Sequence, residues 1–457
     1  MTSQNKGLKY SIDYFIEELS LTTPSESRIN LMPYLLELNY FEDIYSNSIS
    51  GKVVLSESIG LLSKTGLNGT ESIKVRFKKS KDHEEYIDRT FRVFSVSDRT
   101  LSKNYSFEKY VLEFCSEELF VSEQFRISKS YKGKIISDII EDVMKNFLKV
   151  SGKSINIQKT TGTYDFVLPN KKIFETINWL SSYALPANGN VGADMLFFEN
   201  VEGYIFASLQ NLFNQSPVYQ YSYNPKNITN LDMEYNLRTI LKLEIMDYFD
   251  SLGSLNKGLF SNRLLSIDTI NRKKTTTDFD YNDYFGKSKS LNGYPVTNQY
   301  KNSVGKTMYN PPDKNYESGT LRMVVSSQTD TRVDYIKNSP EDVPRDFFIE
   351  KSLPNRVAQI GLANHTRLKI TVPGNSDLHA GMTVNLKILN TNPLSGVNNP
   401  AAGSSNVRTD DPHLSGKYLV SAIRHIISPG SYVSVIEVCK DSTYGPISGA
   451  GNKNNFI

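Results

Sequence analysis

The sequence predicts a mainly β protein with two similar antiparallel β-barrel domains and an α+β insert between them. Two separate stretches contain short apolar segments with period-two alternation, the pattern of antiparallel strands. The stretch between them has helical periodicity instead. The chain also contains 27 Tyr and 23 Phe against one Trp and uses much Asn, a composition that favours strands and long polar loops.

The first β domain follows a polar N-terminal segment. Residues 1–25 end in a Thr-Thr-Pro-Ser sequence, and we expect them to form an arm. Alternating segments then recur between turn residues, for example at 51–55, 73–77 and 110–114. About six strands within roughly 90 residues are typical of a barrel or sandwich. We therefore place the first β-barrel domain at residues 26–117.

The α+β insert is predicted over residues 118–215. Apolar residues at i, i+1, i+4 and i+5 between 135 and 148 define one face of a helix. A second helix is expected after Asn170, a plausible N-cap residue. Two aromatic segments, 195–199 and 204–208, flank Glu202-Gly203, which predicts a β-hairpin.

The second β-barrel domain is predicted in two parts, residues 216–271 and residues 365–443, because alternation returns in both. Between them, residues 272–364 are expected to form a long polar loop followed by a helix near 347–363. The polar stretch has no sustained period, so we expect it to wrap a neighbouring surface. Residues 444–457 have the composition of a flexible tail.

Length and charge exclude several classes of protein. A chain of 457 residues is long enough for two to four domains. Its 52 basic and 49 acidic residues nearly cancel, which argues against sequence-specific nucleic-acid binding and against an anionic membrane surface as partner. No apolar run is long enough to span a membrane, and no signal peptide is expected. Cys115 and Cys439 are predicted to be core residues of a protein made in a reducing cytoplasm.

The histidines and carboxylates give no pattern of a catalytic or metal site. The five histidines form no HxH or HExxH spacing. His413 and His425 flank the predicted strand at 417–423 and are expected at the surface or barrel rim. The pairs Glu84-Glu85 and Glu117-Glu118 lie at predicted strand ends, where neighbouring side chains point to opposite faces and rarely share a proton. The histidines are His83, His365, His379, His413 and His425.

Two further groups of residues have more than one interpretation. Residues 78–82, Lys-Lys-Ser-Lys-Asp, are predicted to be a charged hairpin tip rather than a nucleic-acid contact. Four aromatic residues of the polar stretch could stack on sugars or bases, or pack onto another subunit: Tyr281, Tyr284, Phe285 and Tyr294. The sequence thus predicts no catalytic, no cofactor-binding and no metal-ligating residue.

Four groups of segments, in this order and spacing, resemble one known family. They are residues 40–44 with 50–53; 130–140 with 169–180 and 197–206; 261–268 with 279–281; and 372–382 with 414–425. In these segments the chain resembles the central baseplate hub proteins of contractile-tailed bacteriophages, the T-even-like tail hub family. That family shares its two-barrel plan with the N-terminal half of type VI secretion spike proteins. The resemblance extends over about residues 40–440.

The resemblance implies a structural virion protein. Hub proteins of this family are homotrimers whose six barrels form a pseudo-sixfold ring, which adapts the sixfold tail tube to the threefold spike and lets DNA pass after spike release. It implies a separate spike chain below, a tail tube or tube-initiator protein above, and tape measure and baseplate wedge proteins as further partners. It also implies assembly in the host cytoplasm, and it brings no catalytic residue and no cofactor.

Two alternatives remain open from the sequence. A phage-associated peptidoglycan hydrolase could carry its two carboxylates within the β domains without any local signature. A receptor-binding or carbohydrate-binding tail protein could use the Tyr- and Asn-rich stretch at 272–345.

Overall fold

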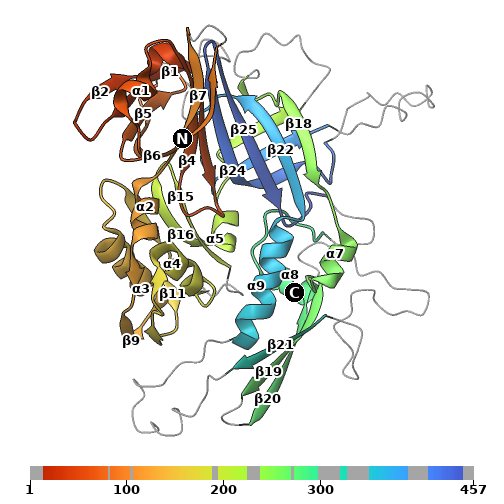
Figure 1. Ribbon diagram of the computed structural model, residues 1–457. Helices are drawn as coiled ribbons and strands as arrows, with labels where there is room; N and C mark the ends of the chain where they lie inside the picture. Colours follow the sequence, from red (N-terminus) through yellow and green to blue (C-terminus); the bar gives the residue numbers. More distant parts are fainter. Residues whose placement is uncertain are drawn as a thin grey trace, which may run out of the picture.

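The structure is a computed structural model, and it describes residues 14–80, 83–102, 106–187, 194–223, 237–268, 272–296, 320–326, 349–389 and 410–445. The chain is mostly β, with 49% strand and 20% helix, which confirms the predicted fold class. Two groups of mostly antiparallel strands stand side by side, with the insert and a separate, smaller sheet below them (Figure 1). The domain limits given above remain predictions.

The first group of strands curls around one apolar core. Their order in the sheet is β3-β4-β7-β6-β5-β1-β2, and all pairs are antiparallel. Alternate residues point inward, as in β5, where Ile73, Val75 and Phe77 are buried. The strands are β1 (Phe15–Thr22), β2 (Arg28–Asn30), β3 (Leu35–Asp43), β4 (Ser50–Glu57), β5 (Ser72–Lys78), β6 (Ile87–Leu101) and β7 (Glu108–Cys115), with η1 (Met32–Tyr34) and α1 (Leu61–Thr65) between them.

The predicted N-terminal arm is wrong for most of the described part of that segment. Strand β1 pairs with β5 and β2, and its Leu19 and Leu21 are buried in the core. The sequence FIEELSLT places acidic residues outward, which made the segment look polar although its inward positions are apolar. Residues 1–13 lie outside the described residues.

The second group of strands forms a barrel of its own. Its order is β18-β22-β25-β24-β23-β17, and Ser222 of β17 bridges to Thr239, just before β18. The amide of Ile240 donates to Ser222 and the amide of Leu241 donates to Thr371 of β22, so this segment links the two ends of the sheet. The strands are β17 (Tyr219–Tyr223), β18 (Lys242–Asp247), β22 (Thr366–Pro373), β23 (Thr383–Ile388), β24 (Gly416–Ser428) and β25 (Ser431–Lys440).

One long strand joins the two groups into a single 13-stranded sheet. The first part of β24 pairs with β23, ending at Leu419, and its second part pairs with β3, from Ala422 to Ile427. A register shift between Val420 and Ala422 marks the change of partner. The far end of the β24–β25 hairpin therefore contributes Ile427 and Tyr432 to the first core.

The insert packs three helical segments against the hairpin β15–β16. That hairpin pairs Asn200 with Gly203, which confirms the predicted hairpin, although its turn is Val201-Glu202, one residue earlier than predicted. The helix expected after Asn170 starts at Ile173 with Lys172 as N-cap, while Asn170 takes a positive φ of 53° in the preceding turn. The elements are α2 (Glu117–Gln124), β8 (Arg126–Ile127), β9 (Ser130–Lys134), α3 (Ile136–Asp142), the π-helix η2 (Val143–Leu148), β10 (Ser154–Ile157), β11 (Thr160–Thr161), β12 (Tyr164–Val167), β13 (Lys171–Lys172), α4 (Ile173–Ser181), β14 (Leu185–Pro186), β15 (Met195–Asn200), β16 (Gly203–Ser208) and α5 (Leu209–Phe213).

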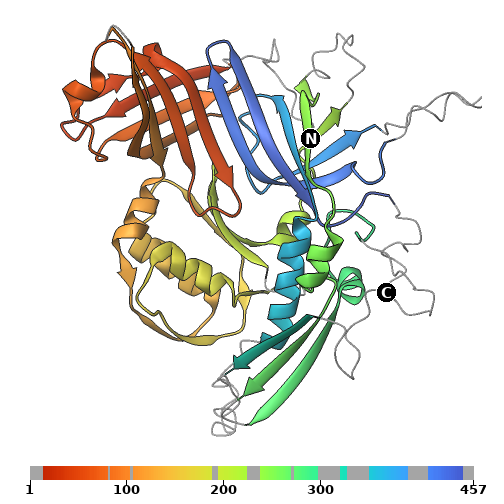
Figure 2. The ribbon, with the colours of Figure 1, turned by 45° about the vertical axis from the view of Figure 1, so that its right-hand side comes forward.

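Two described segments of the predicted long polar loop are strands of a separate three-stranded sheet. Strand β19 (Ser261–Asp268), expected in the second barrel, instead pairs with β20 (Lys273–Asp280) and β21 (Thr320–Ser326). The described helices near this sheet in sequence are α7 (Ser251–Asn256), α8 (Tyr281–Lys287) and α9 (Ile349–Ala363). Helix α9 confirms the helix predicted near 347–363. The sheet extends beyond the end of α9 (Figure 2). Residues 297–319 and 327–348 of the predicted loop lie outside the described residues.

A buried ion pair holds the insert to the first group of strands. The ammonium of Lys153, whose side chain is only 10% exposed, lies 2.6 Å from Glu118 and 2.6 Å from Glu199. The second oxygen of Glu199 accepts from the backbone amide of Ile49, 2.9 Å away, at the start of β4. Two carboxylates that are largely out of contact with water therefore share the charge of one lysine.

Replacing Lys153 tests this junction. In Lys153→Met two buried carboxylates lose their counter-charge, and we expect the free energy of unfolding to fall by ~3–5 kcal/mol. Urea denaturation followed by circular dichroism measures the change. Lys145→Met is the matched control, because Lys145 pairs with Glu141 on an exposed helix surface and its loss should leave the midpoint unchanged. Equal effects of the two substitutions would contradict this role of Lys153.

Candidate assembly surfaces

The seam between the two barrels is built on an aromatic cluster. His425 of β24 lies between Tyr40 of β3 and Tyr432 of β25, with ring centroids 5.9 Å apart on each side. Phe77 of β5 meets Tyr432 edge to face at 6.1 Å. His425 was expected at the surface or rim, but it is fully buried, and burial lowers the pKa of its imidazole to about 4. It is therefore a neutral core residue of the seam.

A polar junction connects both barrels and the insert at one point. The buried Glu42 of β3 accepts from the Tyr40 hydroxyl at 3.0 Å and from the Ala380 amide of the second barrel at 2.9 Å. From the insert, the amide nitrogen of Asn200 lies 3.0 Å from Nδ1 of His379 and 3.1 Å from the carbonyl of Ala380. Three units that are distant in sequence thus share one hydrogen-bond network.

The charges of this junction are set by burial. Burial raises the pKa of Glu42 to about 7, although the nearby His379 and the hydrogen bonds act in the opposite direction. Burial alone would lower the pKa of His379, but Glu202 and Glu42 outweigh it and raise that pKa. His379 Nε2 lies 3.3 Å from a Glu202 oxygen, so the two groups are within ion-pair distance. Their relative orientation is not that of a hydrogen bond.

A second polar contact crosses the seam on the side of β5. Lys79 pairs with Asp377 of the second barrel, and the other Asp377 oxygen lies 2.8 Å from His83 Nε2. Burial would raise the pKa of Asp377, but Lys79, His83 and Tyr219 outweigh it and lower the pKa. Potential ligand atoms of His83, Glu85 and Asp377 lie within 4.8 Å of one another, the spacing of a metal site. Because Lys79 already neutralises Asp377, the arrangement functions as an ion-pair cluster.

The structure differs from the prediction at the charged hairpin tip, residues 78–82, and at the carboxylate pair Glu117-Glu118. Lys78, Lys79 and Ser80 are buried and form no exposed tip, and Lys79 contacts Ser376 and Asp377 of the second barrel, while residues 81–82 lie outside the described part. Glu117 and Glu118 open helix α2 instead of ending a strand. Glu118 faces Lys153 and Glu117 faces Arg92, which assigns both carboxylates to ion pairs.

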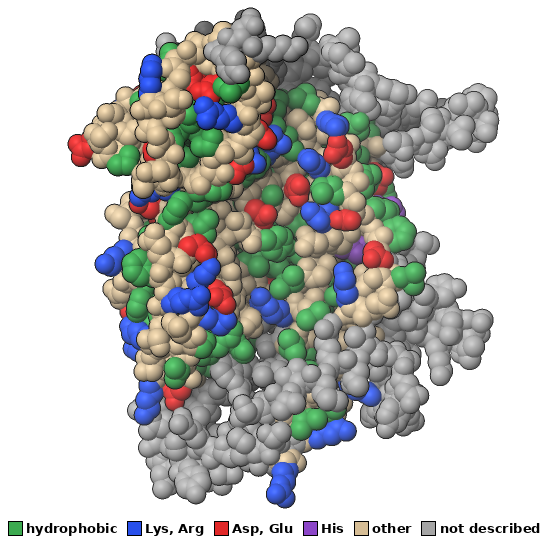
Figure 3. All heavy atoms as spheres, viewed as in Figure 1, with side chains coloured by type: hydrophobic (Ala, Val, Ile, Leu, Met, Phe, Trp, Pro, Cys, Tyr) green, Lys and Arg blue, Asp and Glu red, His purple; other side chains and the backbone are tan. Residues whose placement is uncertain are grey.

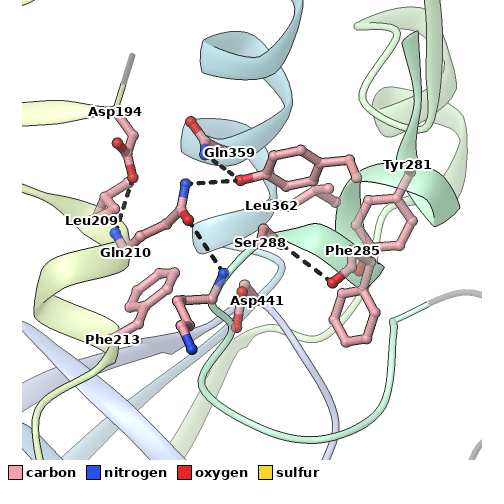
Figure 4. Close-up of a pocket in the computed structure, with 12 residues that line it drawn as sticks. Asp194, Leu209, Gln210, Phe213, Tyr281, Phe285, Ser288, Gln359, Leu362 and Asp441 are labelled. Atoms are coloured by element: carbon pink, nitrogen blue, oxygen red, sulfur yellow. Dashed lines mark hydrogen bonds between the residues drawn. The ribbon is translucent and has the colours of Figure 1, made fainter. Parts of the chain in front are cut away.

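The aromatic residues of the predicted loop pack inside this chain. Tyr281, Tyr284 and Phe285 are buried between α8 and α9 and line a cavity of about 20 Å³ (Figure 4). Gln210 of the insert reaches the Tyr284 hydroxyl there, at 3.4 Å. Such a volume holds one water molecule and no sugar or base. Stacking on a ligand is therefore excluded for these three residues, whereas Tyr294 is half-buried beside Thr443.

The remaining predicted residues lie in the interior or in turns. Cys115 and Cys439 are buried in β7 and β25, as predicted, and burial raises the pKa of each thiol to about 12. Burial also lowers the pKa of His365 to about 4. His413 follows Asp411 in a turn, where the Asp411 carboxylate accepts from its amide.

Large apolar side chains are exposed in two strand segments. On the first barrel they lie along the outer half of β6, and on the second they lie along β18 and the residues after it. Sequence analysis missed both, because alternation shows that a strand has an apolar face without showing whether that face is covered. Elsewhere, acidic and basic side chains are interspersed over the face seen in Figure 3, in keeping with the small net charge. The exposed apolar residues of the two strand segments are Phe94, Val96, Leu101, Leu241, Ile245, Met246, Tyr248, Phe249 and Leu252.

Comparison with known proteins relates the chain to phage tails. No family model matches it. It is 24% identical over 419 residues to the probable baseplate hub protein gp334 of Vibrio phage KVP40, covering 89% of each chain. Its fold is similar to that of the tail protein from Neisseria meningitidis MC58 (TM-score 0.51, 11% identity, 94% of this chain and 97% of the other). The 43 kDa tail protein of prophage MuSo2 from Shewanella oneidensis has the same TM-score at 9% identity, with 93% and 99% covered.

The fold, two joined barrels with an insert, is similar to that of these two tail proteins. By sequence the chain is related to a probable baseplate hub protein of a phage. In the described part of the chain, no helix is long and apolar enough to cross a membrane.

The polar junction predicts a dependence of stability on pH. Because the folded protein binds a proton at Glu42 up to about pH 7 while a free carboxyl releases it near 4.5, the folded state holds more protons between these values. The free energy of unfolding should therefore decrease as pH rises from 5 to 7, with a contribution from Glu42 of up to ~3 kcal/mol. Urea titrations at several pH values measure this slope.

Glu42→Gln should remove most of that slope while it keeps an oxygen acceptor. Glu37→Gln is the control on the same strand, because the Glu37 side chain is 39% exposed. If Glu42→Gln and the wild type show the same slope, the protonation assigned to Glu42 is wrong.

Proposed function

We propose that the chain is the central hub of a phage baseplate, in which three copies form a ring of six barrels between the sixfold tail tube and a threefold spike. The observation that carries this proposal is the continuous sheet from one barrel to the other through β3 and β24, in a chain related to a baseplate hub protein. Two barrels fixed side by side provide two similar units per copy. Three copies then present six units to a sixfold partner, while the assembly itself has threefold symmetry.

The physical requirements of such a ring match the molecule. Each copy must be internally rigid, since the two barrels replace neighbouring subunits of a true sixfold ring. The aromatic seam, the Glu42 junction and the Lys79–Asp377 pair supply this rigidity. Each copy must also expose apolar surface toward the next one, because obligate interfaces are apolar at the centre. The exposed segments of β6 and β18 meet this requirement.

The partners follow from the same proposal. A tail tube or tube-initiator protein binds above, and a separate spike protein binds below. Tape measure and baseplate wedge proteins contact the periphery, and the protein acts in the virion after assembly in the host cytoplasm. No catalytic, cofactor-binding or metal-ligating residue is assigned, and the pair Glu117 and Glu118 takes part in ion pairs.

The mass of the purified protein tests the ring. Light scattering after size exclusion should give a mass near three times the 51.7 kDa of one chain. A monomer at micromolar concentration, both alone and mixed with its spike protein, would refute the trimer.

Enzymatic activity is tested separately. A zymogram with peptidoglycan in the gel should show no clearing at the position of this chain, with hen lysozyme as positive control. Clearing that disappears in a Glu118→Gln variant would establish a hydrolase and contradict the purely structural role.

A further inference from the structure

The outer half of β6 lacks a strand partner on one edge. Strand β5 pairs with β6 only as far as Arg92, and one more hydrogen bond joins Val93 to Glu71. Beyond that point, residues 94–101 pair with β7 alone among the described residues. A free strand edge presents unpaired amides and carbonyls, and with apolar side chains it binds other strands readily.

Strand β18 has the same property in the second barrel. The segment before it bridges to β17, but within the described chain residues 242–247 pair only with β22. Six large apolar side chains between Leu241 and Leu252 are exposed. So many apolar residues in so short a segment exceed the scattered exposure that is normal for a soluble surface.

One exposed apolar residue on each of the two strands faces the interior of its barrel. Val96 is paired with Leu112, and Ile245 with Leu368; both of these partners are fully buried. Directly paired residues of antiparallel strands point to the same face of a sheet. Val96 and Ile245 therefore lie on core faces, yet they are 38% and 52% exposed. Within the described residues, no further strand covers either core at this edge.

The two open edges lie on different barrels and on opposite sides of the seam. In the sheet order, β18 is at one end, and the β24–β3 pair separates it from β6. Figures 1 and 2 show β18 on the side of the second barrel that faces away from the first. A contact between two different surfaces is heterologous, and repetition of such a contact closes into a ring when the rotation fits.

We infer that residues 94–101 of β6 in one copy pair edge to edge with β18 of the next copy. The added strand covers Val96 on one side and Ile245 on the other, so each barrel core is completed by the neighbouring chain. Within one chain, β3 and β24 already join the two barrels by antiparallel pairing between barrel edges. The inference rests on the proposed ring and specifies which surfaces close it.

Cross-linking tests this pairing. A variant with Val96→Cys and Ile245→Cys is treated with a bismaleimide that spans roughly 8 Å. This length reaches directly opposed residues and diagonal neighbours on paired strands. We expect covalent dimers and trimers from the double variant, covalent dimers but no trimers from a mixture of the two single variants, and no cross-link from either single variant alone. The native Cys115 and Cys439 are buried and serve as the unreactive background.

Cross-links within a single variant would show an interface between like surfaces and overturn the inference. A trimer by light scattering that gives no cross-link in the double variant would also overturn it, while the proposed ring would stand. A monomer by light scattering would instead count against the ring itself, so the two failures are distinguishable.

A second test places a charge at the edge. Ile245→Lys and Val96→Lys should each convert the trimer to a folded monomer with an unchanged circular dichroism spectrum. Val167→Lys is the matched control, because Val167 is 70% exposed on the insert and lies in neither edge. A trimer that persists in both edge variants would refute the pairing.

Discussion

The structure depends on the change of partner along β24. One strand of 13 residues pairs first with β23 and then with β3, so a single backbone ladder runs through both barrels. Backbone hydrogen bonds leave no rotational freedom between the two units, unlike a flexible linker. The register shift after Val420 is the local adjustment that lets the strand leave one barrel and enter the other.

The insert is placed by polar contacts rather than by the sheet. Glu199 and Asn200, the last residues of β15, reach the first barrel through Ile49 and the second barrel through Ala380. Two adjacent residues on a strand point to opposite sides, which allows one strand end to contact both barrels. Buried polar contacts of this kind require correct geometry and so specify one orientation of the insert.

Sequence analysis was reliable for the type of element, which local periodicity indicates. It was unreliable for the burial and pairing of an element, which depend on distant segments. The hairpin at Gly203 and the helix α9 followed from turn residues and spacing. Strand β1 was missed because its outward acidic residues hide its buried leucines. Strand β19 was assigned to the wrong sheet, since strand pairing between distant segments leaves no mark in either segment. The buried positions of Lys79 and His425 have the same cause, because Asp377 and Tyr40, against which they lie, come from distant parts of the chain.

The sequence by itself determined the mainly β class, the helical insert and the relation to phage hub proteins, because these depend on local alternation and on the order of segments. Only the tertiary structure decided that the two barrels share one sheet, that three aromatics with two open interpretations are core residues, and that two barrel edges have no further strand partner among the described residues. The physical reason is that strand pairing and burial are properties of segments far apart in sequence. Val96 and Ile245 are ordinary strand residues in the sequence, and only the pairing around them shows that their core faces are uncovered.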